Sequence, residues 1–341
     1  MTSRGLQIAK VTLHAARRAA IQLLCPLLLV WLVASAAFAA PHKPKPIQPP
    51  WMVADAPYRI HVRLGTASEL PEAGIVINIP GCNLTRPDLA DVILTDRDGV
   101  PQPLAKIASR PGSRILLLAQ KLEPEVPYFL YFGGGQVRTS PEWTPKVSLL
   151  METRPAPADL KFDSLQSLKT AWNLSPEAPG AGFVSLIYHG GNPFGPNTRF
   201  LTRYTGYLRV PKAKEITFYT LSSDCSFVVI NDQHQFGWPG QHSPHADPNT
   251  VTKKTIPCPE GLVKVEYWAA KGEAPLMGRL EAASVLGWQT DTGFETIPTE
   301  AWLHPGAANV GPIQRANGQL VPMPKVNTES YIGYGLSLIH I

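Results

Sequence analysis

The sequence predicts a mainly β protein, in which an export signal precedes two antiparallel β-sandwich modules and one short helix. Charged side chains make up only 17% of the 341 residues, and the chain carries 35 prolines and 27 glycines. Turn residues are therefore frequent and strong helix formers sparse, which favours many short strands. In several segments apolar and polar residues also alternate with a period of two, as they do in half-buried strands.

Residues 1–39 have the pattern of an export signal. A basic start without acidic residues leads into an apolar run over residues 19–33, and Ala37 and Ala39 fit the small-residue cleavage rule. We expect cleavage after Ala39. The alternative is an uncleaved anchor, because the apolar stretch approaches the ~20 residues that span a bilayer. The expected location is secreted, periplasmic or cell-surface, in a chain of bacterial type.

The signal also explains the positive charge of the chain. The net charge of +5 falls to +1 when cleavage removes Arg4, Lys10, Arg17 and Arg18. The charge therefore does not indicate a nucleic-acid partner, and we expect none. Contact with a membrane is expected only through the signal or anchor segment.

Residues 40–50 form a proline-rich spacer of the extended, polyproline-like type. Residues 51–138 form the first expected sandwich. Its opening strand, residues 58–64, alternates apolar and polar positions, and Asp98–Gly99 is a hairpin-turn signal. Further strands are expected over residues 75–79, 92–94, 115–118 and 128–132.

Residues 139–160 form a proline-rich linker, in which residues 149–152 have the composition of a short strand. Beyond the linker, apolar residues recur at three- and four-residue spacing. This spacing predicts a short amphipathic helix capped by Asp163 or Ser164. The apolar positions are Phe162, Leu165, Leu168 and Trp172.

Residues 161–290 form the second expected sandwich, which includes that helix. Its strands are expected over residues 204–210, 215–220, 227–230 and 262–268. Residues 291–335 fit neither module, and we expect them to be the start of a further, truncated module or a tail. Residues 336–341 resemble a translated sequencing-library scar, which excludes them from fold reasoning.

Each module carries a resemblance. Residues 51–133 are similar to an uncharacterised β-sandwich domain of secreted bacterial surface proteins, through Trp51 with Tyr58–Arg59, residues 88–92 before Asp98–Gly99, and residues 128–133. The second half resembles the protective-antigen-type (PA-fourteen) domain. The matching motifs are residues 204–208 before Pro211, residues 216–219, residues 222–224, an apolar run into Asn231–Asp232, and residues 263–267. That resemblance implies a β-sandwich of the kind found in toxins, adhesins and glycosidase inserts.

The resemblance also implies a calcium site. Lectin members of the family hold calcium with two consecutive aspartates in the turn that here contains Asp224 and Cys225. Because calcium takes oxygen ligands and a thiol is a poor substitute, calcium is disfavoured, and Asp224 stays a weak metal candidate. We expect no cofactor. The alternative role of Asp224 is a hydrogen bond to the turn backbone.

A cluster of polar and aromatic residues follows that turn and is the candidate glycan-binding surface. Indole faces and side-chain amides grip sugars by stacking and paired hydrogen bonds. The alternative is that Trp238 covers a sandwich edge and the histidines are solvated. A zinc site built from Cys225 and the histidines matches no standard spacing. The candidate residues are Asp224, Asn231, Asp232, Trp238, Gln241 and His242, with His234 and His245 nearby.

Three cysteines remain after cleavage: Cys82, Cys225 and Cys258. An oxidising compartment permits a disulfide, and Cys225 and Cys258 lie in the same module, so they are the pair that a disulfide would join. The alternative is that all three are buried thiols.

The sequence carries no nucleophile-elbow, phosphate-loop or zinc-protease motif, and we expect no catalysis by this chain. The expected function is non-catalytic extracellular binding or adhesion, with weak recognition of an extracellular or cell-wall glycan by the second module. One alternative is the N-terminal accessory part of a larger secreted hydrolase. Another is a structural surface spacer.

Overall fold

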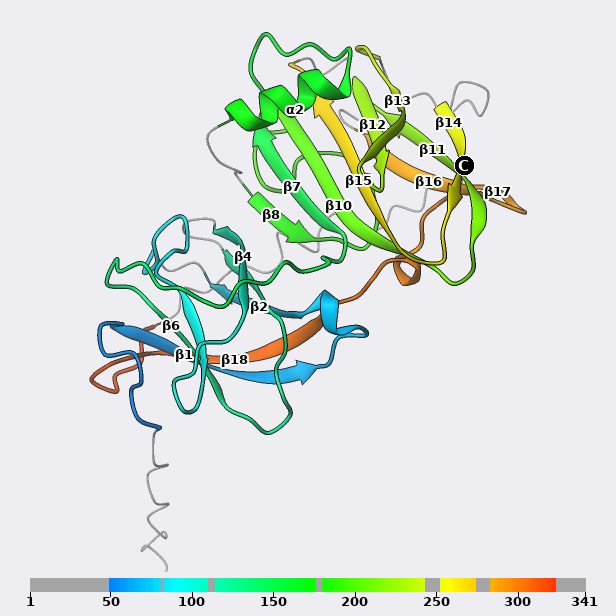
Figure 1. The fold of residues 1–341 in the computed structure, drawn as a ribbon. Helices are drawn as coiled ribbons and strands as arrows, with labels where there is room; N and C mark the ends of the chain where they lie inside the picture. The colour runs from blue at the N-terminus through cyan, green and yellow to red at the C-terminus, as the bar shows by residue number, and fades with distance from the viewer. Residues whose placement is uncertain are drawn as a thin grey trace, which may run out of the picture. The chain divides into compact units, whose positions relative to one another are not determined.

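The fold is described from a computed structural model, which covers residues 49–80, 83–109, 114–175, 180–242, 252–273 and 283–322. The expected signal, most of the spacer, Cys82, His245 and the expected scar lie outside these residues. Residues 1–50 and 51–341 form separate units. The described part of the second unit is mainly β with one α-helix, as the sequence predicted (Figure 1).

The first module is built on one seven-stranded sheet, in the order β3-β6-β1-β18-β2-β5-β4. Neighbouring strands are antiparallel except β2 and β18, which run parallel. A short 3-10 helix, η1 (Pro71–Ala73), precedes β2. The strands are β1 (Tyr58–Thr66), β2 (Ile75–Pro80), β3 (Ile93–Asp96), β4 (Leu104–Ser109), β5 (Arg114–Ala119), β6 (Tyr128–Phe132) and β18 (Gly306–Arg315).

Both halves of this sheet contribute to one hydrophobic core. Ile60 and Val62 of β1 lie in the same buried cluster as Ile77 of β2 and Leu117 of β5. Ile60 and Val62 alternate with the less buried His61 and Arg63, which is why the period-two pattern located this strand, although Arg59 before them is also buried. The same cluster takes Leu94 from the edge strand β3 and Leu104 from the edge strand β4, so strands at both edges of the sheet contribute to one core.

The strand β18 differs from the sequence-based expectation for residues 291–335. Residues 306–315 do not begin a further module but insert between β1 and β2. Two glycines and Pro312 hide the alternation that would have marked this strand. A β-bulge in β18 places Gly311 and Pro312 opposite the single residue between Ile60 and Val62 of β1, and it accommodates the proline, which has no N–H to donate.

The second module is a sandwich of two antiparallel sheets. Sheet B has the order β13-β12-β15-β10-β7-β8, and sheet C has the order β14-β11-β16-β17 with β9 also on β16. A 3-10 helix, η2 (Thr299–Ala301), follows β17. The strands are β7 (Leu150–Pro155), β8 (Gly180–Phe183), β9 (Tyr188–His189), β10 (Phe200–Val210), β11 (Lys214–Ser222), β12 (Cys225–Ile230), β13 (Gln233–Trp238), β14 (Thr252–Cys258), β15 (Gly261–Lys271), β16 (Ser284–Thr290) and β17 (Gly293–Thr296).

The core of this sandwich lies between the two sheets. Tyr204 and Tyr267 from sheet B and Phe218 from sheet C are fully buried in it. The strand β7 pairs with β10 inside sheet B, so residues 150–155, expected in a linker, form part of the sandwich. Pro155 is the last residue of β7. Its missing N–H therefore does not interrupt the hydrogen bonds between β7 and its neighbours earlier in the strand.

One helix, α2 (Leu165–Leu174), covers the outer face of sheet B (Figure 1). Ser164 caps it: its side chain accepts a hydrogen bond from Ser167 N at 3.2 Å, which confirms the sequence-based cap. Leu168 and Trp172 pack on Trp268 of β15 within one buried cluster. The guanidinium of Arg154 lies 4.3 Å above the Trp172 ring and donates to Trp172 O, which anchors the helix end to β7.

The possible disulfide between Cys225 and Cys258 does not form, and both are buried free thiols, as the alternative had it for these two. Cys225 faces the cluster under α2, whereas Cys258 lies in the core between the sheets, on the other side of sheet B. Burial raises the pKa of both thiols. They therefore act as small buried apolar groups.

Within the described residues, no helix combines the length and the apolarity that crossing a membrane requires.

Candidate functional site

The predicted glycan-binding residues separate into two groups, at opposite ends of β12. Asp224 precedes the strand and Asn231 follows it. Six residues at about 3.3 Å each place these ends about 20 Å apart. The sequence cluster is therefore not one surface.

At the far end, Asn231 and Asp232 form the hairpin turn between β12 and β13. Both have positive φ angles, 47° and 65°, as a two-residue turn that follows the twist of its strands requires. Asn231 Oδ1 accepts from Lys264 N at 3.0 Å, and Lys264 Nζ lies 2.6 Å from Asp232 Oδ1. Both side chains are engaged in holding the turn.

At the near end, the loop after β13 closes on the Asp224 turn. Trp238 and His242 stack with ring centroids 3.8 Å apart, and Asp224 N donates to His242 O at 2.8 Å. Gly240 N donates to Phe162 O at 2.7 Å, just ahead of α2. One face of the Trp238 indole is therefore covered by an imidazole and is closed to a sugar ring.

The Asp224 turn does not offer the donor set of a calcium site. Asp224 Oδ2 already accepts from Lys271 Nζ at 3.1 Å and from Gly272 N at 2.9 Å. The Cys225 thiol lies among apolar residues, and burial raises its pKa, so it supplies no anionic oxygen or thiolate. Among the residues that the structure describes, no three His, Cys, Asp or Glu side chains gather as metal ligands.

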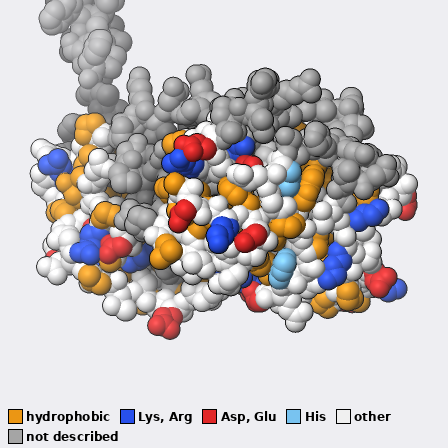
Figure 2. Space-filling model, turned by 90° about the horizontal axis from the view of Figure 1, so that it is seen from above, with side chains coloured by type: hydrophobic (Ala, Val, Ile, Leu, Met, Phe, Trp, Pro, Cys, Tyr) orange, Lys and Arg blue, Asp and Glu red, His pale blue; other side chains and the backbone are white. Residues whose placement is uncertain are grey.

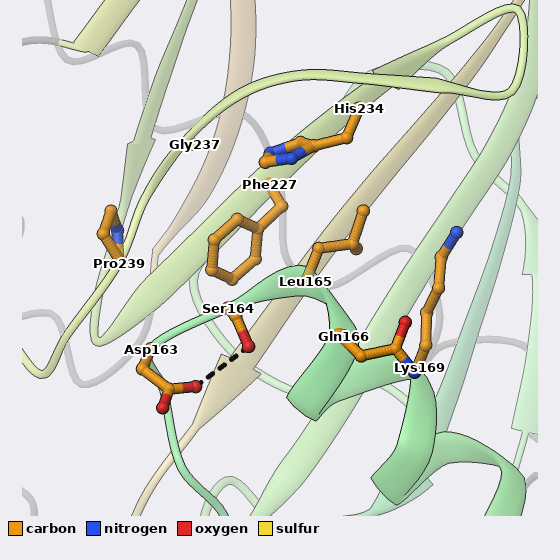
Figure 3. A pocket seen from close by; sticks show the side chains of 9 residues that line it. All are labelled: Asp163, Ser164, Leu165, Gln166, Lys169, Phe227, His234, Gly237 and Pro239. Atoms are coloured by element: carbon orange, nitrogen blue, oxygen red, sulfur yellow. Dashed lines mark hydrogen bonds between the residues drawn. The ribbon is translucent and has the colours of Figure 1, made fainter.

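A cavity of about 540 Å³ lies between the start of α2 and the β12–β13 hairpin (Figure 3). Sites for small ligands typically fall in the range of about 300–1,000 Å³. Its walls come from three segments: the helix start, the outer face of β12, and β13 with the residue after it. The lining residues are Asp163, Ser164, Leu165, Gln166, Lys169, Phe227, His234, Gly237 and Pro239.

The centre of this pocket is apolar. Figure 3 shows Phe227 and Leu165 in the middle of the pocket, with polar side chains around them. His234 packs edge-on against Phe227, with centroids 5.8 Å apart. Phe227 and Leu165 are only 3% and 8% exposed, so they form the floor of the pocket, over which the apolar face of a ligand would lie.

The margin of the pocket is polar. Asp163 Oδ1 accepts from Ser167 Oγ at 2.7 Å and from Ser164 Oγ at 3.0 Å, and these hydrogen bonds lower the pKa of the fully exposed Asp163 carboxyl. The carboxyl is therefore an ionised acceptor at neutral pH. Gln166 adds an exposed amide and Lys169 an ammonium, on the side away from Asp163 (Figure 3).

Charges on the described part of the surface seen in Figure 2 are mixed in sign and interspersed with apolar side chains. No single-sign patch dominates that face where it is described. A ligand meeting it would be selected by local contacts more than by a broad field.

Of the pocket residues, the sequence predicts His234 near the glycan surface. It predicts Asp163 only as a helix cap, and it gives no role to Gln166 or Lys169. The helical spacing does predict that Gln166 and Lys169 are solvent-exposed, because residues on the polar face of an amphipathic helix face water. Which strands that helix lies beside depends on long-range packing, and the local sequence does not carry it.

No protein-family profile matches the chain, and no curated protein matches it. Among solved structures, it is similar to a PA14 sugar-binding domain from an RTX adhesin, with 16% identity over 46% of this chain and 98% of that chain, at a TM-score of 0.37. It is also similar to the epithelial adhesin 9 A domain of Candida glabrata in complex with Galb1-4GlcNAc, with 9% identity over 47% and 90% of the two chains, at a TM-score of 0.35.

A third similar structure is an anti-sigma factor domain-containing protein from Clostridium clariflavum. The identity is 14% over 72% of this chain and 83% of that chain, at a TM-score of 0.33. At these scores the likenesses carry no argument about ligand or activity.

Proposed function

We propose that the protein is a non-catalytic extracellular binding protein whose second module recognises a carbohydrate weakly in the pocket beside α2. The observation that carries the proposal is the pocket itself: an apolar centre at Phe227 and Leu165, ringed by a carboxylate, an amide and an imidazole. A pyranose presents the matching surface, a C–H face bordered by hydroxyl groups that donate and accept hydrogen bonds.

The weak affinity follows from the openness of this arrangement. Asp163 and Gln166 are exposed, so each hydrogen bond to a sugar there replaces one to water and adds only about 0.5–1.5 kcal/mol. Adhesion would then depend on several copies acting together on a surface glycan. We prefer this pocket to the Trp238 loop as the sugar site, because His242 already covers one face of the indole in that loop.

A glycan array followed by titration calorimetry on the best hit tests the proposal. His234→Ala and Gln166→Ala change exposed pocket side chains without opening the core, and each is expected to weaken binding about 5- to 10-fold, as the loss of one hydrogen bond or ring contact does. Gln241→Ala is the matched control, because Gln241 is equally exposed but belongs to the loop at the Asp224 turn.

Binding that is lost in Gln241→Ala and kept in both pocket variants would refute the pocket and restore the loop as the site. A folded protein that binds no glycan at all would refute carbohydrate recognition and leave the role of a surface spacer.

A further inference from the structure

Lys271, the last residue of β15, forms a buried ion pair with Asp224. The ammonium lies 3.1 Å from Asp224 Oδ2, and the two side chains are only 11% and 12% exposed. The same oxygen accepts from Gly272 N at 2.9 Å. Asp224 itself has a φ of 62°, so the turn places its carboxylate through a conformation that few residues adopt without such support.

The pair lies where three chain segments meet. Asp224 N donates to His242 O, and Asp224 Oδ2 accepts from Gly272 N. The turn before β12, the loop after β13 and the end of β15 are thus tied around one carboxylate. Loss of the Lys271 ammonium would therefore destabilise all three segments.

A buried carboxylate needs a positive partner, since an uncompensated charge in such a place costs several kcal/mol. A divalent cation and an ammonium are two ways to supply it. Here the ammonium is covalently part of the chain. A calcium ion on the same carboxylate would lie close to Lys271 Nζ, where like charges repel, and would find a buried thiol at position 225 in place of a second carboxylate.

We propose that Lys271 is the resident counter-ion of the Asp224 turn, so that this end of the second module is held without a divalent cation. The consequence is a module whose folding is independent of calcium, although its resemblance implies a calcium-dependent one. The inference stands whether or not the pocket binds a sugar, because its readout is stability.

Calorimetric unfolding of the full chain tests it. The melting temperature in EDTA and in about 5 mM calcium chloride is expected to agree within about 1 °C, because extracellular calcium modules with millimolar affinity would be saturated at that concentration. A rise of several degrees with calcium would overturn the proposal.

Removal of the charges of the Asp224–Lys271 pair tests the role of Lys271 directly. Lys271→Met keeps the side-chain length and removes the charge, and is expected to lower the melting temperature by on the order of 10 °C. Lys264→Met is the control: that ammonium is 29% exposed and pairs with both the 72% exposed Asp232 and Glu266, and its loss is expected to cost less than that of the 11% exposed Lys271.

The double variant Asp224→Asn/Lys271→Met removes both charges and is expected to lose less than the sum of the two single variants. Where Lys271→Met alone fails to fold, a double variant that folds is the expected result, and a double variant that also fails to fold would overturn the proposal. An effect of Lys271→Met no larger than that of Lys264→Met would overturn the role of Lys271 as the counter-ion, as would simple additivity of the two single variants.

Discussion

Leu168→Ala is the sharpest test of how α2 is held on sheet B. Leu168 is fully buried at the middle of the helix, in the cluster that contains Trp172, Trp268 and Phe227. Truncation of a fully buried leucine removes its transfer free energy and leaves a cavity, at a combined cost of about 3–4 kcal/mol. In a domain of this size that loss lowers the melting temperature by roughly 10 °C.

Urea unfolding followed by tryptophan fluorescence measures the loss directly, because Trp172 and Trp268 lie in contact within the perturbed cluster. Leu174→Ala is the matched control on the same helix: Leu174 is 76% exposed, and its truncation is expected to change stability by less than about 0.5 kcal/mol. A loss below about 1 kcal/mol for Leu168→Ala would refute the packing of α2 described above, and with it the helix wall of the pocket.

Two further predictions concern the interior of the second module. Burial lowers the pKa of His189 to about 4, and the unfolded value is near 6.5, so the unfolded state binds the proton first as pH falls. Stability should therefore be constant above about pH 6.5 and decrease by up to about 3 kcal/mol towards pH 4, and His189→Gln should flatten that part of a melting-temperature-against-pH curve. Gly287→Ala should destabilise the module by more than about 2 kcal/mol in urea unfolding, because a Cβ there collides with the Tyr219 ring and Glu295 O. Gly311→Ala is the control and should be nearly neutral, because a Cβ there has ordinary contact distances. Equal effects of the two substitutions would refute the close packing at Gly287.

The strands and the helix were predictable where the sequence carries a local period. The alternation over residues 58–64 and the spacing of Leu165, Leu168 and Trp172 both located their elements, since burial of one face imposes the period. β18 was not predictable in this way. Its glycines and Pro312 break the alternation, and its partners β1 and β2 are more than two hundred residues earlier in the chain.

The candidate site was predictable only in part, for a geometric reason. Asp224 and Asn231 are close in sequence, but the strand between them is extended and carries them to opposite ends of sheet B. Asp163 and His234 are seventy-one positions apart, yet they line one cavity because a helix and an edge hairpin meet there. Proximity in sequence is a poor guide to a shared surface where strands intervene.

The location of the pocket follows from the way sheet B is covered. All six residues of β12 are buried, because the sandwich core covers one face of this strand and α2 covers the other. Most side chains on such a strand are closed to a soluble ligand, and of this strand only Phe227 lines the pocket. β13 is the edge strand of sheet B, and its first residues are exposed.

The boundary between the covered strand β12 and the exposed edge strand β13 is where an apolar side chain, Phe227, lies next to exposed polar ones such as His234. A site that needs both kinds of contact arises at that boundary, and the polar residues there can vary without disturbing the core beneath them.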